Sequence, residues 1–189
     1  GLHGIAVMDG LVRAGAEAVL IERAADILPQ FGPQVTRLAH DALARRSTVL
    51  KGTRVERARS RRGRIESLEL SGGRVLPVDF VVLTAGILPA TDLLARAGAH
   101  LAPDGSAYVT ERAETSLAGI FACGICVSVP HLWSGMHLWS AQGAIADKTA
   151  QVAGANAAGG DARLAPLAGT LIRRVLDLSI ARTALTAGR

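Results

Sequence analysis

Two cysteines that flank a glycine are the residues whose types and spacing first suggest chemistry. Cys123 and Cys126 form a C-x-x-C pair around Gly124. One interpretation is that the two thiols are a redox pair. The other is that the apolar residues 120–122 form a short strand, and that Gly124 at its end lets the backbone approach a flat cofactor closely.

The redox interpretation is less favoured, because a thioredoxin-like pair needs its first cysteine at the N-terminus of a helix, where the thiolate is stabilised. The run that follows Cys126, Val-Ser-Val-Pro, does not start a helix. A zinc site made by the two cysteines with His131 and His137 is also disfavoured, because the gap between the pairs is far shorter than in zinc fingers. We expect both histidines to lie in a loop.

A second group of residues, at the start of the chain, suggests dinucleotide binding. Gly1 and Gly4 fit the last two glycines of a G-x-G-x-x-G turn, in which a pyrophosphate lies against a helix N-terminus. Glu22 would then accept hydrogen bonds from the adenine-ribose hydroxyls. Its charge would repel a 2′-phosphate and so favours NAD, while the neighbouring Arg23 leaves NADP open. The alternative is an ordinary helix start.

The elements that must position these residues follow from apolar periodicity. It predicts helices between Gly4 and Gly15, from Pro33 onwards, and over residues 92–97 and 141–158. It predicts strands over residues 17–22, 53–60, 64–70, 75–78, 79–83 and 108–110, and an edge or interface strand over residues 170–180.

Two of these elements carry more specific expectations. The apolar run 79–83 is typical of a fully buried strand, and it ends at Thr84-Ala85-Gly86. There the backbone would either press against a nicotinamide or ribose, or simply turn into the next helix. The last helix presents a row of small residues, which predicts its packing face: Ala146, Ala150, Ala153 and Ala157.

Composition favours a soluble globular protein with a sizeable core, since 49% of the 189 residues are hydrophobic and 20% are charged. The net charge of +5 raises the question of nucleic acid. Its largest arginine cluster, around a hairpin turn at Gly63, lacks the aromatic residues that would stack bases, so we expect a solvated turn and no nucleic-acid partner. No apolar run approaches the roughly 20 residues that span a bilayer, and no secretory signal is present. We therefore expect a cytoplasmic protein without a membrane partner.

Four motifs, in order, resemble the pyridine nucleotide-disulfide oxidoreductases, and most of all the branch of NADH oxidases, NADH peroxidases and coenzyme A-disulfide reductases. Gly1-Leu2-His3-Gly4 through Glu22-Arg23 is similar to that family's NAD-binding loop, helix and second strand. Residues 78–89 resemble the strand of that family that ends in A-T-G-x-x-P. Residues 115–126 resemble its T-S-x-x-x-I-y-A-x-G-D-C signature, and residues 169–186 resemble the opening of its dimerisation domain.

The resemblance implies an α/β fold in which a Rossmann-like NAD(P)-binding domain is inserted in an FAD-binding domain. We expect residues 1–88 in the first, residues 89–163 in the returning part of the second, and residues 164–189 in a stub of the dimerisation domain. Both cofactor domains would be incomplete, as in a fragment of the family enzyme.

The resemblance also implies a homodimeric FAD flavoprotein that passes hydride from NAD(P)H to the flavin, and then to a disulfide, peroxide or oxygen acceptor. Its substrate would be a small molecule or a thiol or disulfide. By the same resemblance, the nicotinamide cofactor would contact Gly1, Gly4, Glu22, Arg23 and Gly86. FAD would contact Gly124 and Ile125. We expect no catalytic residue and no metal ligand here, because the family's redox cysteine would precede Gly1.

One departure from the family pattern bears directly on function. Ile125 stands where the family has an aspartate that hydrogen-bonds the ribityl chain of FAD. An isoleucine side chain cannot accept that bond, which would leave a buried hydroxyl without a partner at a cost of about 1–3 kcal/mol. The alternative function is therefore a non-catalytic nucleotide-binding or interaction fragment derived from such an enzyme.

Overall fold

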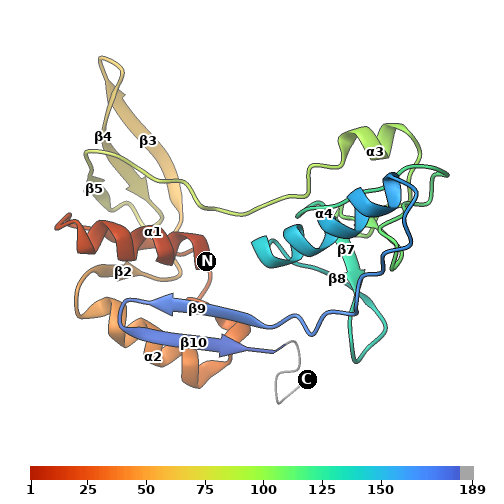
Figure 1. Ribbon diagram of the computed structural model, residues 1–189. Helices are drawn as coiled ribbons and strands as arrows, with labels where there is room; N and C mark the ends of the chain where they lie inside the picture. Colours follow the sequence, from red (N-terminus) through yellow and green to blue (C-terminus); the bar gives the residue numbers. More distant parts are fainter. Residues whose placement is uncertain (184–189) are drawn as a thin grey trace. The chain divides into compact units, whose positions relative to one another are not determined.

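The computed structural model describes residues 1–183, which fall into two compact units (Figure 1). The first unit holds residues 1–86 together with the chain from Leu171 onwards, and the second holds Ile87–Thr170. The boundary between Thr170 and Leu171 differs from the domain boundary that we expected at residue 163. The division into three domains stays a prediction.

The first unit contains two helices of twelve residues and three small sheets. Its elements up to residue 77 are α1 (Leu2–Arg13), β1 (Val19–Ile21), the 3₁₀ turn η1 (Pro29–Phe31), α2 (Pro33–Ala44), β2 (Thr48–Leu50), β3 (Val55–Arg61), β4 (Arg64–Leu70) and β5 (Val75–Pro77). Strands β1 and β2 are parallel, whereas β3, β4 and β5 form an antiparallel sheet. The predicted first two helices and the hairpin over residues 53–70 are thus confirmed.

Helix α1 ends where the sequence predicts it. The N–H of Ala16 donates to the carbonyl of Leu11 at 3.0 Å, and the N–H of Gly15 donates to that of Val12 at 3.1 Å. This is the Schellman pattern, which satisfies two carbonyls that the helix leaves unpaired. Helix α2 begins with Pro33 at its first position, where a missing N–H costs nothing.

The chain beyond Leu171 forms a hairpin of β9 (Leu171–Val175) and β10 (Leu178–Arg182) rather than the single strand that we expected. Both helices of the first unit contact this hairpin, which Figure 1 shows beside α2. At its turn, Asp177 pairs with Arg46 at 2.9 Å, and Arg13 donates to the Leu176 carbonyl at 3.0 Å. The hairpin therefore closes the first core, whose largest fully buried side chains are Ile5, Ile27, Leu28, Leu43, Val175 and Leu176.

The expectation of a buried strand over residues 79–83 is wrong. The side chains of Phe80 and Leu83 are 56% and 85% exposed, and no backbone hydrogen bond joins residues 80–83 to the rest of the described chain. The last bond of the ladder runs from the N–H of Val78 to the carbonyl of Glu66, beyond which the chain leaves β4. An apolar run becomes a buried strand only when other strands pair with its edges and helices cover its faces, and neither occurs here.

The second unit places a small sheet beside one long helix. Its elements are α3 (Asp92–Arg96), β6 (Ala107–Tyr108), β7 (Val127–Pro130), β8 (His137–Trp139) and α4 (Gly143–Ala157). Strand β7 lies between parallel β6 and antiparallel β8. Over residues 1–183, no helix combines the length and the apolar character needed to cross a bilayer.

Two sequence expectations for this unit need correction. Residues 120–122 are not a strand, because only Phe121 pairs, in an isolated bridge with Glu114. The strand of this region is β7, which follows the cysteine pair. His137 lies in β8 rather than in a loop, where its Nδ1 is 3.1 Å from the Ser128 carbonyl. A short apolar run that glycine interrupts does not determine where a strand begins and ends. The strand that pairs with it determines those ends.

Helix α4 is confirmed, but of the four alanines predicted to form its packing face only Ala153 is buried. Ala150 and Ala157 are exposed. The buried face is one of larger side chains at helical spacing, which removes more apolar area from water than a row of methyl groups. Its members are Ile145, Thr149, Val152, Ala153 and Asn156.

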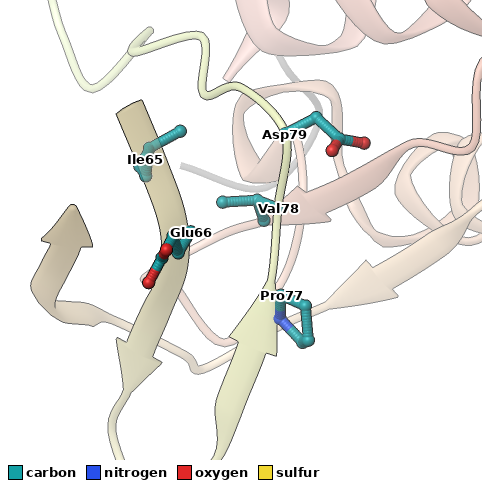
Figure 2. A pocket seen from close by; sticks show the side chains of 5 residues that line it. All are labelled: Ile65, Glu66, Pro77, Val78 and Asp79. Atoms are coloured by element: carbon teal, nitrogen blue, oxygen red, sulfur yellow. The ribbon is translucent and has the colours of Figure 1, made fainter. Parts of the chain in front are cut away.

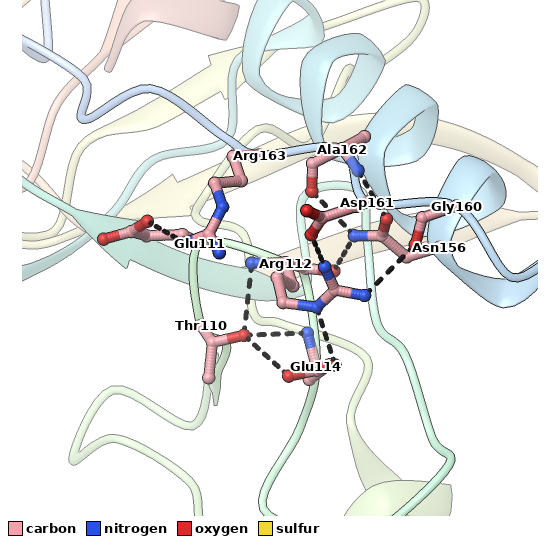
Figure 3. A network of polar contacts seen from close by, with 9 residues as sticks. All are labelled: Thr110, Glu111, Arg112, Glu114, Asn156, Gly160, Asp161, Ala162 and Arg163. Atoms are coloured by element: carbon pink, nitrogen blue, oxygen red, sulfur yellow. Dashed lines mark hydrogen bonds and ion pairs between the residues drawn. The ribbon is translucent and has the colours of Figure 1, made fainter.

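A polar network anchors the C-terminal end of α4 (Figure 3). The amide nitrogen of Asn156 donates to the carbonyls of Arg112 and Ala162, both at 2.8 Å, and its Oδ1 accepts the N–H of Ala162 at 2.7 Å. The Arg112 guanidinium pairs with Glu114 at 3.1 Å and with Asp161. Asn156 is buried, so these bonds hold the end of the helix against the chain that follows β6.

Candidate functional site

The N-terminus of α1 and the end of β1 bring Gly1 and Glu22 together. The Gly1 amino group donates to Oε2 of Glu22 at 2.9 Å, and the N–H of Ala24 donates to Oε1, also at 2.9 Å. No side chain caps α1. A helix end whose N–H groups lack partners attracts anions through those donors and through the helix dipole. This end of the unit thus offers donors for a phosphate beside an acceptor for hydroxyl groups.

The environment of Glu22 keeps its carboxylate charged. Partial burial acts to raise the pKa of Glu22, but hydrogen bonds from the backbone N–H groups of Ala24 and Arg23 help to hold it below its ordinary value. At neutral pH the side chain is therefore an acceptor only, which is the state that can receive two ribose hydroxyls.

Gly4 lies where α1 meets both β1 and the chain before Gly86. A Cβ atom at Gly4 would be 2.8 Å from Oγ1 of Thr84 and 3.4 Å from Cδ1 of Leu20. The helix can approach these neighbours only because Gly4 has no side chain. Thr84 is a positioning residue that the sequence did not single out, although it directly precedes Ala85-Gly86.

The other two residues predicted to bind the nicotinamide cofactor lie in open positions. Arg23 is exposed and forms no ion pair within residues 1–183. Gly86 has a φ of +146°, and no atom lies within 4 Å of the place that a Cβ would take. A ligand can therefore approach this backbone, whereas any side chain at Gly86 would be strained.

The Gly124 turn is held by α4. Gly124 has a φ of +93°, and its N–H donates to Oγ1 of Thr149 at 2.9 Å. The Thr149 hydroxyl in turn lies 2.8 Å from the carbonyl of Ile145. The Gly124 N–H is therefore already satisfied, but the space that a Cβ would fill is open. A flat ligand could approach the turn through this space rather than through the N–H.

Ile125 is 41% exposed, so its side chain has no enclosing core. Its carbonyl accepts a hydrogen bond from Nε1 of Trp139 in β8 at 2.7 Å. The residues that fix this turn, Thr149 and Trp139, were missed from the sequence. The signal for Thr149 was its helical spacing from Ile145, which the row of alanines obscured.

Two hollows in the first unit are lined by none of the seven predicted cofactor residues. One of about 310 Å³ lies between β4 and the chain leaving β5, lined by Ile65, Glu66, Pro77, Val78 and Asp79 (Figure 2). A neighbouring one of about 580 Å³ reaches the hairpin tip at Arg61, Arg62 and Arg64. Both are open. The first is lined by two carboxylates, and the second mixes charges of either sign, so neither forms an enclosed apolar binding site of the kind that holds most small ligands.

Comparison with known proteins assigns the chain to a family. Residues 1–145 match the family model of the pyridine nucleotide-disulphide oxidoreductases. An NADH oxidase of Methanocaldococcus jannaschii is 27% identical over 188 residues, which cover 99% of this chain and 42% of that protein. A CoA-dependent NAD(P)H sulfur oxidoreductase of Pyrococcus furiosus is 26% identical, over 98% of this chain and 42% of that protein.

Solved structures agree with this assignment. An FAD-dependent pyridine nucleotide-disulphide oxidoreductase from Desulfovibrio vulgaris superposes with a TM-score of 0.90 at 29% identity, covering 98% of this chain and 47% of that one. A NAD-dependent persulfide reductase from A. fulgidus gives 0.87 at 28% identity, covering 96% and 34%. The chain thus spans less than half the length of these relatives. The α/β fold class predicted from the sequence is confirmed, and the chain belongs to the pyridine nucleotide-disulphide oxidoreductase family.

Proposed function

We propose that this chain is part of an oxidoreductase that uses NAD(P)H and FAD. The observation that carries the proposal is the uncapped N-terminus of α1 with the Glu22 carboxylate at the same end. The Desulfovibrio vulgaris protein, which is FAD-dependent, and the Methanocaldococcus jannaschii NADH oxidase support both cofactors.

Each predicted residue has a role that its surroundings permit. The first-turn N–H groups of α1 bind the pyrophosphate, and Gly4 lets the helix lie close to Thr84. Glu22 orients the adenine ribose, with Arg23 beside it. The open backbone at Gly86 lies along the nicotinamide end, while Gly124 and Ile125 lie along FAD. When bound, the two cofactors supply hydride transfer, and the residues of this chain supply position and electrostatics.

The acceptor is a disulfide, a peroxide or oxygen, in keeping with the words oxidase and sulfur oxidoreductase in the names of the relatives. We further propose a homodimeric, cytoplasmic enzyme that prefers NADH over NADPH. The preference follows from Glu22, because a charged carboxylate at the ribose repels a 2′-phosphate.

Titration of NADH and NADPH by fluorescence tests the nicotinamide site. Replacing Glu22→Gln should weaken NADH binding about tenfold, because a hydrogen bond to a charged acceptor is lost. NADPH should bind equally well or better. The matched control is Glu17→Gln, which removes an exposed carboxylate from the same segment and should change neither affinity. If the two variants behave alike, Glu22 does not contact the nucleotide.

One observation favours the second candidate, a non-catalytic nucleotide-binding protein. Ile125 offers FAD no acceptor at the position where the family uses aspartate. The protein should be incubated with FAD, freed of excess by gel filtration, and examined by visible absorbance and NADH oxidation. Ile125→Asp should retain more flavin than the parent chain. NADH binding without flavin retention in either protein would favour the non-catalytic function.

A further inference from the structure

The cysteine pair has a geometry that the cofactor contacts do not explain. The Cys126 thiol lies back across the turn, with its Sγ 3.2 Å from the carbonyl oxygen of Cys123. The chain bends at Gly124, which has a left-handed backbone conformation that glycine tolerates, and then turns through Ile125. The two thiols therefore belong to one tight turn, in which the Cys126 thiol is folded back onto the residue that carries the other thiol.

The two thiols differ in access. Cys123 is exposed, whereas Cys126 is half-buried. Burial raises the pKa of the Cys126 thiol, with a smaller contribution in the same direction from Cys123. Since the thiolate is the attacking species, Cys123 is the thiol that meets an oxidant first, and Cys126 is placed to react second.

We propose that Cys123 and Cys126 form a reversible intramolecular disulfide that closes the Gly124 turn. The pair is not a thioredoxin-type centre, because β7 and not a helix follows it. It is a modification site that takes low-molecular-weight disulfides as its reactant. The bond would join the chain before Gly124 to the start of β7, and so stiffen the turn that Thr149 already holds.

The reaction is thiol–disulfide exchange in two steps. The Cys123 thiolate attacks one sulfur of a disulfide RSSR, a new S–S bond forms, and RS⁻ leaves and takes a proton. Cys126 loses its proton to solvent and attacks the Cys123 sulfur, which displaces the second RS⁻. Two cysteine thiols are oxidised and one RSSR is reduced to two RSH.

Mass spectrometry of the whole chain after exposure to glutathione disulfide tests this directly. Both cysteines lie in one tryptic peptide, residues 113–148. In the parent protein this peptide should lose the mass of two hydrogens, and dithiothreitol should restore it. In Cys126→Ser the same peptide should instead accumulate one glutathione on Cys123. In Cys123→Ser, glutathione should add to Cys126 several times more slowly, because that thiol is half-buried.

Three results would overturn the proposal: two free thiols in the parent peptide after oxidation, a stable glutathione adduct on Cys123 despite an intact Cys126, or covalent dimers as the main product. Circular dichroism of each serine variant shows whether it is folded. Should a serine variant not fold, alkylation of the parent at graded ratios of reduced to oxidised glutathione still decides the question. Both thiols must then disappear together for the proposal to stand.

Discussion

At Gly4 the lack of a side chain determines how closely α1 approaches its neighbours. The hydroxyl of Thr84 occupies the place that a β-carbon would need, while Gly10, on the same helix, has no atom within 4 Å of the equivalent place. The two glycines of α1 therefore have different effects. Gly4 permits a close contact beneath the expected nucleotide site, whereas Gly10 merely lowers helix propensity.

The substitution Gly4→Ala should lower the free energy of unfolding by about 1–2 kcal/mol, because Thr84 or α1 must shift to admit the methyl group. Gly10→Ala should raise it by up to about 1 kcal/mol through helix propensity. Urea denaturation measures both. Adding Thr84→Ala to Gly4→Ala should recover most of the loss, and simple additivity of the two changes would contradict a direct contact.

Glu22 should make stability depend on pH in acid. Its pKa in the folded protein is lowered from an ordinary value of 4.5, so its contribution is present above that value and is lost as the pH falls through the folded pKa. The contribution is under about 1 kcal/mol, since solvent reaches the Glu22 carboxylate. Between pH 6 and pH 3, thermal unfolding of Glu22→Gln should therefore change less than that of the parent, while Glu17→Gln should follow the parent curve.

At the scale of elements, α4 shows that a helix can bind a turn through one buried hydroxyl. Thr149 accepts the N–H of Gly124 while its own proton is directed to the helix carbonyls of Ile145 and Ala146. The turn that we expect to meet FAD is thereby fixed to α4 at Gly124, while Trp139 of β8 holds it at the Ile125 carbonyl.

Thr149→Val should destabilise the protein by about 1–3 kcal/mol, because the shape is kept while the Gly124 N–H loses its acceptor. Thr149→Ser keeps the hydroxyl and should lose only what one buried methyl group contributes, about 1 kcal/mol. Guanidinium denaturation compares the two. Since Thr149→Val keeps the methyl group, a Val variant as stable as the parent would show that the hydrogen bond does not matter at this position.

Elements whose signals are local could be predicted from the sequence, and elements that depend on distant partners could not. The Schellman end at Gly15 and the proline start of α2 follow from neighbouring residues alone. Residues 79–83 have the composition of a buried strand, but burial depends on pairing that composition does not encode. Likewise Thr84 and Thr149 act across the fold, so only their three-dimensional neighbours reveal them.

At the scale of the whole molecule, the two units have separate cores. One is built from α1, α2, β1 and the β9–β10 hairpin, and the other from β6, β7 and α4. The chain passes between the units near residues 86 and 170. The motif order along the sequence predicted the family, but it did not show that the chain returns to the first unit at Leu171, because hairpin packing on α1 and α2 is a contact between distant segments.

Because the two units have separate cores, we expect a substitution that destabilises one unit to leave the stability of the other unchanged. Asn156→Leu removes the buried side chain that bonds both Arg112 and Ala162, which leaves partly buried backbone groups unpaired and should cost about 2 kcal/mol. Hydrogen exchange should then accelerate across residues 87–170, while amides of α1, α2 and β9 keep the protection that they have in the parent.

The control Gln151→Leu alters an exposed amide on the same helix and should leave the protection of both units within about 0.5 kcal/mol of the parent. Equal acceleration in both units would instead mean that they unfold as one cooperative body.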